Sequence, residues 1–467
     1  MTITLYSDQD QLKQEIRQSM RSSKSVLAVA QTGFGKTLTA ASMMADAAEK
    51  GNTSWFMVPR RELLRQTMQS LSEYGVEYGV IASGVRPNPF AKIQLVTSGT
   101  VARRLDKLQP PNILFQDEAH YCGAQVDRII DWARDAGSWR IGLTATPIRL
   151  DGRGLDRHYD TMVEGPSLAE LIRMGRLSDF RYFAPYVPDL SGIRTSNGEL
   201  NRKQLDEKMA ADRVRVGSAI DHYKRLAMGK KNICFNTSVR DAETTAEQFR
   251  ESGIPTAAVY GKLGDEEIKR RVRALAKGEL LCLTSVEILT FGFDLSSAAG
   301  MDVTVESLSM MRPTESRALA GQMWGRSLRK KPFPAIIMDH AGVSQKFGMP
   351  SDEQEWTLEG RKKVNRDGTE KTIPVRQCPS CYFVHRPTPS CPACGHVYEI
   401  NSRVIEEVEG DLVEVTRDQL QDVKKQERML QGKSQTLDEL TELGKRKGYK
   451  NPYGWARQVM KGRKRGK

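Results

Sequence analysis

The sequence lacks the features of a membrane or secreted protein. It contains no run of 18 apolar residues, and its N-terminus has no basic region followed by an apolar stretch. A helix that spans a bilayer needs about 20 mostly apolar residues, and a secretory signal peptide needs a basic start and an apolar core. We therefore expect a protein without a membrane partner that works in the cytoplasm.

Cysteine is scarce and unevenly placed. The 467 residues include seven cysteines, and four of them lie within residues 378–394. In a cytoplasmic setting this distribution argues against a disulfide framework. Cys122, Cys234 and Cys282 lie in or beside apolar segments and are interpreted as ordinary buried residues.

The C-terminal end has no acidic residues. Residues 445–467 contain ten lysines or arginines, which leaves +3 of the net charge of +13 to the other 444 residues. Attraction to backbone phosphates supplies much of the non-specific affinity for DNA or RNA, so we expect this segment to bind nucleic acid. A solubilising tail or a localisation signal is the alternative. Tyr453 and Trp455 would either stack on bases or pack a small helical hairpin.

Residues 30–37 (AQTGFGKT) carry a phosphate-binding pattern between an apolar strand and a helix. The glycines let the backbone curl so that its N–H groups point at phosphates, the lysine adds positive charge, and the last threonine offers its hydroxyl to Mg²⁺. Ala30 departs from the general pattern, which begins with glycine. The nucleotide-binding residues predicted in this loop are Thr32, Gly33, Gly35, Lys36 and Thr37.

A pair of carboxylates follows a second apolar strand. Residues 112–116 predict a strand that runs directly into Asp117 and Glu118. Because ligands gather at the carboxyl ends of parallel strands, both side chains should face the phosphate-binding loop. Asp117 would hold Mg²⁺ together with Thr37, and Glu118 would orient and deprotonate the attacking water. The two segments together predict hydrolysis of ATP.

Further motifs follow in a fixed order, and with them the chain resembles superfamily 2 DEAD/DEAH-box helicases over roughly residues 1–345. Short strings at 311–316 and 339–342, and the cysteine cluster after the core, resemble RadD-type and phage branch-migration helicases. The resemblance implies a bacterial cytoplasm or a phage-infected host cell. The motifs are residues 56–64, 96–100, 117–120, 143–147, 233–238, 290–294 and 322–329.

The same resemblance assigns roles to residues outside the phosphate-binding loop. Gln9 would read adenine, and Gly292 and Asp294 would lie near the ribose and the cleft between two lobes. Gln322 would position nucleotide or water, while Arg326 and Arg329 would reach the γ-phosphate when the lobes close. The residues expected to grip the strand backbone are Arg60, Thr100, Asn236 and Ser238.

The cysteine cluster predicts a metal site. Two Cys-x-x-Cys pairs separated by nine residues have the spacing of a tetrahedral zinc ribbon. Because thiolates fill all four positions, we expect a structural Zn²⁺. His385 and His396 would be solvent-facing or would support the ligands, and a redox pair or an iron–sulfur cluster is the alternative. The predicted ligands are Cys378, Cys381, Cys391 and Cys394.

Apolar strand segments alternate with helical patterns, which predicts parallel sheets covered by helices. The fold class is therefore α/β, with two tandem RecA-like domains, a small zinc ribbon and a short helical basic tail. We place the domains at residues 1–164, 165–345, 375–400 and 401–467, with an extended loop at 185–198. The predicted strands are residues 25–31, 54–59, 93–97, 113–116, 141–146, 232–238, 256–261, 280–286, 303–306 and 335–339.

The leading functional hypothesis is an ATP-dependent DNA helicase or translocase that acts on branched or single-stranded intermediates of repair, recombination or replication. An RNA helicase of the same superfamily is the first alternative, because the motifs grip the sugar-phosphate backbone. An ATP-switched accessory scaffold that binds DNA or a protein is the second. A single-strand-binding protein or a recombinase would be the protein partner. No nuclease or methyltransferase motif occurs, which argues against a restriction subunit.

Overall fold

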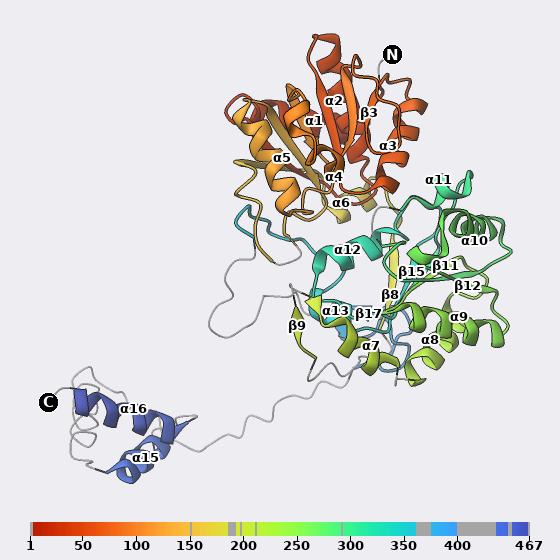
Figure 1. The fold of residues 1–467 in the computed structure, drawn as a ribbon. Coiled ribbons are helices and arrows are strands. Elements are labelled where there is room, and N and C mark those ends of the chain that lie inside the picture. The colour runs from red at the N-terminus through yellow and green to blue at the C-terminus, as the bar shows by residue number, and fades with distance from the viewer. Residues whose placement is uncertain are drawn as a thin grey trace. The chain divides into compact units, whose positions relative to one another are not determined.

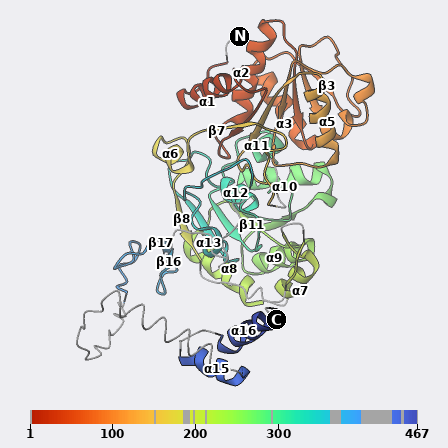
Figure 2. The same cartoon turned by 90° about the vertical axis from the view of Figure 1, so that its left-hand side faces the viewer.

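The computed structural model describes residues 3–149, 152–184, 193–196, 199–210, 213–290, 293–360, 375–398, 436–446 and 451–465. The chain forms two compact units, residues 1–399 and 400–467. The first unit contains two α/β lobes and a small hairpin domain, and its helices gather around the two sheets in Figures 1 and 2. The predicted fold class, with two RecA-like lobes, is confirmed.

The first lobe is built on a parallel sheet of seven strands in the order β3-β4-β2-β5-β6-β1-β7. Every residue of β1, β2 and β4 is buried, because helices cover both faces of the sheet. The five strands expected in this lobe are present, whereas the short strand β3 and the half-exposed edge strand β7 carried no clear apolar signal. The strands are β1 (Ser25–Val29), β2 (Ser54–Val58), β3 (Gly79–Ile81), β4 (Ile93–Thr97), β5 (Ile113–Gln116), β6 (Trp139–Thr144) and β7 (Thr161–Glu164).

Alternate side chains of β2 pack on opposite faces of this sheet. Phe56 and Val58 belong to the core that includes helices α1 to α3, whereas Trp55 and Met57 pack with Ile129 of α5 on the other side. The layers therefore follow from the pleat of buried strands. The helices are α1 (Ser7–Ser19), α2 (Lys36–Glu49), α3 (Arg61–Glu73), α4 (Ser98–Val101), η1 (Leu105–Lys107), α5 (Ala124–Asp135) and α6 (Leu168–Arg173).

The second lobe has a parallel sheet of six strands in the order β12-β13-β11-β14-β15-β8. The strand expected at residues 303–306 was wrongly placed, since β14 comprises the next four residues. Its buried serines are satisfied by the Asn232 side chain, since Ser307 donates to the amide oxygen at 3.0 Å and Ser309 accepts from the amide nitrogen at 3.1 Å. The strands are β8 (Phe180–Phe183), β11 (Asn232–Phe235), β12 (Thr256–Val259), β13 (Cys282–Ser285), β14 (Ser307–Met310) and β15 (Ala335–Asp339).

Helices flank the second sheet, and the loop predicted at 185–198 lies mostly outside the described residues. Within that stretch, residues 195–196 pair with the two residues after it to form the hairpin β9 (Thr195–Ser196) and β10 (Glu199–Leu200). The helices are α7 (Arg202–Ala210), α8 (Arg213–Leu226), α9 (Val239–Glu251), η2 (Gly261–Leu263), α10 (Asp265–Lys277), α11 (Leu295–Ala299), α12 (Arg317–Gly325) and α13 (Val343–Phe347).

The outer edge strand β12 is covered by side chains instead of another strand. Arg250 donates to the Thr256 carbonyl oxygen at 3.0 Å, and Arg271 donates to that of Ala258. These carbonyls would otherwise be open acceptors for a further strand. Two arginines from the flanking helices therefore occupy acceptors along this edge of the sheet.

The segment 349–360, which we call the strap, leaves the second lobe and returns to the first. The Leu358 carbonyl oxygen accepts from the N–H groups of Leu155 at 2.7 Å and Asp156 at 3.1 Å. Leu358 and Trp356 pack in the cluster that contains Ala119. A Cβ on Gly154 would lie 1.9 Å from the Leu358 oxygen, so only glycine fits at that position. The strap was not recognised in the sequence, because its apolar residues show no helix or strand period.

The hairpin domain at residues 375–398 packs against the second lobe. Its strands are β16 (Arg376–Gln377) and β17 (Val384–His385). Phe383 contacts Phe183 with ring centroids 5.5 Å apart, and the Ala184 N–H donates to the Tyr382 oxygen at 3.1 Å. Arg386 forms an ion pair with the buried Asp352 of the strap. The hairpin domain therefore covers the β8 edge of the sheet and holds the strap.

In the second unit, the two expected helices are α15 (Leu437–Arg446) and α16 (Pro452–Arg465). Leu440 and Ala456 are fully buried between them, and Trp455 lies within contact distance of a Cβ built on Gly444. Tyr453, in contrast, has 54% of its surface exposed. Trp455 thus packs between α15 and α16, as the helical-hairpin alternative predicted, whereas the Tyr453 side chain is exposed. The rest of the region 401–435 lies outside the described residues.

We predict that Gly154→Ala loosens the strap. The added methyl group would collide with the backbone of residues 358–360, which should lower the free energy of unfolding by about 1–3 kcal/mol. Denaturant unfolding and limited proteolysis near residue 360 measure both effects. Gly261→Ala is the control, because a Cβ there meets nothing within 4 Å. Equal stability of the two variants would contradict the close fit of the strap.

Candidate active site

The phosphate-binding loop joins β1 to the N-terminus of α2. Gly33 and Gly35 adopt left-handed φ angles of 88° and 97°, which only glycine adopts readily. Space is limited too, since a Cβ on Gly35 would lie 2.4 Å from the Gln9 amide nitrogen. Ala30, which replaces the usual glycine, is buried and donates its N–H to the Thr144 oxygen at 2.8 Å, which continues the pairing of β1 with β6. The loop therefore has the curl that the sequence predicted.

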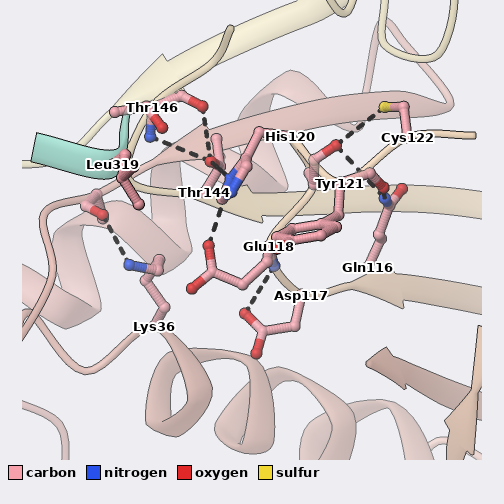
Figure 3. A network of polar contacts seen from close by, with 12 residues as sticks. Lys36, Gln116, Asp117, Glu118, His120, Tyr121, Cys122, Thr144, Thr146 and Leu319 are labelled. Carbon is pink, nitrogen blue, oxygen red and sulfur yellow. Dashed lines mark hydrogen bonds and ion pairs between the residues drawn. The ribbon is translucent and has the colours of Figure 1, made fainter. Parts of the chain in front are cut away.

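Lys36 and the two carboxylates lie at the same edge of the sheet, after β1 and β5, which flank β6 (Figure 3). The Lys36 ammonium donates to the Ala30 oxygen at 3.0 Å. Asp117 follows β5 and is 8% exposed. Burial, and secondly the charge of Glu118, raise the pKa of Asp117 to about 7, while Lys36 acts against this rise. A buried carboxyl group of this kind, with the loop hydroxyl of Thr37, suits a hard divalent cation such as Mg²⁺.

Glu118 occupies a strained backbone position with φ of 48°. Its Oε2 lies 3.4 Å from Nδ1 of His120, and that nitrogen lies 3.0 Å from the Thr144 hydroxyl. Thr144 in turn donates to the Thr146 oxygen at 2.8 Å. Burial lowers the pKa of His120 and keeps the ring neutral. The 117–120 and 143–147 motifs are thus joined through His120 and Thr144. The sequence placed both residues in motifs but assigned neither of them a role.

The second lobe places Arg326 directly after α12. Arg326 donates to the oxygens of Phe293 at 2.5 Å and Thr290 at 3.2 Å. Burial lowers its pKa to about 10, and the charge of Glu118 is among those that raise it again. A Cβ on Gly325 would lie 2.9 Å from Thr32, so α12 packs directly on the phosphate-binding loop. The two lobes therefore meet at the candidate nucleotide site.

Two of the other residues predicted near the nucleotide, Arg329 and Asp294, contact each other, whereas Gln322 lies on α12. Arg329 pairs with Asp294 at 2.9 Å, and Asp294 also accepts from the Ser297 N–H at 2.9 Å as the cap of α11. Burial would raise the pKa of Asp294, but Arg329 and the Ser297 N–H bring it below its usual value. Gln322 is buried on α12. Gly292 lies outside the described residues.

Gln9 supports the loop through both ends of its amide. It donates to the Phe34 oxygen at 2.7 Å and accepts from the Tyr6 N–H at 3.1 Å. Only 2% of its surface is exposed. The structure therefore shows a positioning contact to the loop at this residue, while adenine reading by Gln9 stays a prediction.

The four residues expected to grip a nucleic-acid strand differ in exposure. Arg60 is exposed at the start of α3. Thr100 is buried and accepts from Thr97 at 2.9 Å, and Asn236 is buried and donates to Thr245 at 2.9 Å. Ser238 caps α9 by accepting from the Asp241 N–H at 3.1 Å. The side chains of Thr100 and Asn236 thus hold their own lobes together, because polar groups at strand ends are needed to satisfy buried partners.

The four predicted metal ligands come together in the hairpin domain. Their sulfur atoms all lie within 4.8 Å of one another, with 3.6 Å between Cys378 and Cys394 and 3.7 Å between Cys381 and Cys391. Bonds of about 2.3 Å to a tetrahedral Zn²⁺ imply sulfur separations of about 3.8 Å. The donor set therefore fits Zn²⁺. His385 is buried and lies 2.6 Å from the Tyr398 hydroxyl, so it is not solvent-facing.

The remaining cysteines are buried or half-buried. Cys234 and Cys282 are fully buried on neighbouring strands. Cys122 is half-buried and donates to the Ala119 oxygen at 3.3 Å. The prediction of ordinary buried thiols therefore holds best for the pair in the second lobe.

Comparison with known proteins shows related sequences. The family model described as type III restriction enzyme, res subunit, matches residues 2–149. A 51.5 kDa protein of a Lactococcus phage is 30% identical over 376 residues, which cover 79% of this chain and 78% of the relative. The putative ATP-dependent helicase IRC3 of Saccharomyces cerevisiae is 25% identical over 71% of this chain. The matched region spans only 52% of that yeast relative.

Solved structures share the fold at low sequence identity. The helicase MrfA bound to DNA matches with a TM-score of 0.52 and 17% identity, over 72% of this chain and 46% of that protein. A single-substitution variant of Saccharomyces cerevisiae Dbp5 bound to RNA and ADP BeF3 matches with a TM-score of 0.51 and 15% identity, over 75% and 93% of the two chains. Among the described residues, no helix is long and apolar enough to cross a membrane.

For the cysteine cluster we predict one zinc per chain. Replacing Cys378 and Cys381 together by serine should abolish the metal and expose residues 375–398 to protease, because so short a segment cannot bury a core without it. Elemental analysis of purified protein measures the zinc. A variant with Cys234→Ser serves as the control, since that thiol lies away from the cluster. Full zinc retention in the double variant would place the metal elsewhere.

Proposed function

Since the chain belongs to the superfamily 2 helicases of the DEAD/DEAH-like type, which are ATP-dependent and act on nucleic acid, we propose that it is a DNA helicase or translocase. Its substrates would be single-stranded or branched DNA in repair, recombination or replication, in a bacterial cytoplasm or a phage-infected cell. The observation that carries the proposal is the meeting of the two lobes at one site, where a Cβ built on Gly325 of α12 would lie 2.9 Å from Thr32 of the phosphate-binding loop.

The residues divide the work of ATP hydrolysis in this proposal. The loop N–H groups and Lys36 bind the phosphates, and Thr37 with Asp117 holds Mg²⁺, which would supply charge stabilisation at the phosphoryl group. Glu118 orients the attacking water and takes up its proton. Arg326 reaches the same space only while α12 lies on the loop, so hydrolysis depends on how the lobes close.

Several observations favour DNA over RNA. Two structures that share this fold, the helicase MrfA and the ATP-dependent restriction-modification enzyme LlaBIII, are bound to DNA. The matching family model is also named for a restriction enzyme subunit. RNA stays the second candidate, since Dbp5 is an RNA helicase 24% identical over 59% of this chain. Arg60 is the strongest candidate for gripping the strand, because it is exposed at the N-terminus of a 13-residue helix, where backbone N–H groups attract phosphate.

A comparison of stimulants tests the choice of substrate. The rate of ATP hydrolysis is measured without nucleic acid and with saturating single-stranded DNA, forked DNA or RNA of matched length. The proposal predicts strong stimulation by DNA and weaker stimulation by RNA. Equal or stronger stimulation by RNA would favour the RNA helicase, and no stimulation by either would contradict the proposed function.

We predict that Lys36→Ala and Glu118→Gln both abolish ATP turnover by different routes. Loss of the ammonium removes charge from the phosphate site, so affinity for ATP should fall. Glu118→Gln should still bind ATP, because it loses only the group that activates water; a fall of about 10²–10⁴ in kcat is expected. Binding of a fluorescent ATP analogue and phosphate release separate the two effects. Normal turnover in Glu118→Gln would refute its assigned role.

Removal of residues 445–467 tests the basic tail. The truncation takes away ten positive charges and none of the catalytic motifs. Binding of ATP should persist, while affinity for DNA should fall and depend less steeply on salt, because fewer counterions are released on binding. DNA binding is measured at several salt concentrations for full-length and truncated protein. Identical affinities and slopes would mean that the tail serves another purpose.

A further inference from the structure

Arg60 and Tyr121 form a direct contact between the candidate strand grip and the catalytic loop. The Arg60 guanidinium donates to the Tyr121 hydroxyl at 3.0 Å and lies 5.6 Å from the centre of its ring. Arg60 is exposed and Tyr121 is half-buried. The exposed side chain expected to meet a phosphate is therefore hydrogen-bonded to a residue three positions after Glu118.

Tyr121 belongs to the same hydrogen-bonded turn as Glu118. Its N–H donates to the Glu118 oxygen at 2.8 Å, and its own carbonyl accepts from Gln116 at 3.2 Å. Gln116 accepts from the buried Tyr159 at 2.8 Å. One side of the turn is thus hydrogen-bonded to the buried core, and Figure 3 shows Tyr121 beside Glu118 in this turn. The Tyr121 hydroxyl links the turn to the exposed Arg60.

The second lobe also reaches this cluster. Burial raises the pKa of Tyr121, Arg60 lowers it, and the charges of Glu118 and Glu287 raise it further. Glu287 follows β13 and has a left-handed φ of 61°, which matches the strained φ of 48° at Glu118. A strained non-glycine residue thus follows a central strand in each lobe.

We propose that the Arg60–Tyr121 contact restrains the Glu118 turn in the free enzyme and that a nucleic-acid phosphate releases it by taking the guanidinium. A phosphate is the stronger acceptor, because it carries a negative charge and can accept two hydrogen bonds from the guanidinium, whereas the phenol is neutral. Strand binding is in this way sensed at the ATP site. The inference rests on the proposed function, and it makes Tyr121 a positioning residue rather than a catalytic one.

The test compares basal and stimulated ATP hydrolysis in Tyr121→Phe, Arg60→Ala and the double variant. Tyr121→Phe loses the hydroxyl but keeps the ring, so basal kcat should rise about threefold to tenfold and stimulation by DNA should shrink by a similar factor. Its half-saturating DNA concentration should stay within about twofold of the original or become lower, since phosphate no longer competes with the phenol. Arg60→Ala should raise the basal rate equally and also weaken DNA binding.

The double variant should have the basal rate of either single variant, because both substitutions break one contact. Two control substitutions lie on the outer face of the second lobe: Tyr260→Phe, which loses a hydroxyl bonded to Glu243 at 2.5 Å, and Arg270→Ala, which loses an ion pair with Glu267 at 2.7 Å. Both controls should keep the original basal rate and stimulation.

An unchanged basal rate in Tyr121→Phe, or additive effects on the basal rate in the double variant, would overturn the proposal. If DNA still stimulates the original protein, the proposed function stands in that case. A lack of stimulation in the original protein would instead refute the function. Thermal unfolding and zinc content of each variant identify misfolding. If Tyr121→Phe is less stable than the original protein, Tyr121→Leu takes its place in the comparison.

Discussion

The burial of negative charge at the end of β5 is the constraint on which the site depends. Two adjacent carboxylates lie there, and burial raises the pKa of Asp117 to about 7. Such charge is tolerated in a protein interior only when cations face it. Lys36 on the loop and Arg326 from the second lobe supply positive charge near these carboxylates, and the proposed Mg²⁺ would add to it. Because one of these cations belongs to the second lobe, the charge balance at the site is also a reason for the lobes to meet.

Much of this arrangement could be predicted from local patterns. The phosphate-binding loop, the acidic pair and the four cysteines are specified by residues close together in the sequence, and their chemistry is legible before any fold is known. The central strands were also predictable, since strands buried on both faces of a parallel sheet are continuously apolar. Strand β14 was misplaced because its buried serines are satisfied by Asn232 of the neighbouring strand, a pairing that no local pattern encodes.

The residues expected to contact a nucleic-acid strand could be predicted only in part. A motif places Thr100 and Asn236 in the right segments, but burial and hydrogen bonding decide which side chain in a segment is exposed, and both are consequences of tertiary packing. Arg60 emerged as accessible, and Tyr121, which had no predicted role, became its partner. The strap was also unpredictable, since Trp356 and Leu358 have no periodic neighbours and find their contacts in a lobe more than 200 residues earlier in the chain.

The hairpin domain has a consequence beyond metal binding. Of the two edges of the second sheet, β12 has two outward carbonyls occupied by arginines, whereas β8 is covered by the hairpin through Phe383 and the Tyr382 carbonyl. An uncovered parallel edge strand is a template for pairing with another molecule. A chain whose hairpin domain unfolds would therefore expose the β8 edge to pairing with another molecule. If the four cysteines hold Zn²⁺ as predicted, loss of that metal would promote association between chains even where the candidate nucleotide site is unchanged.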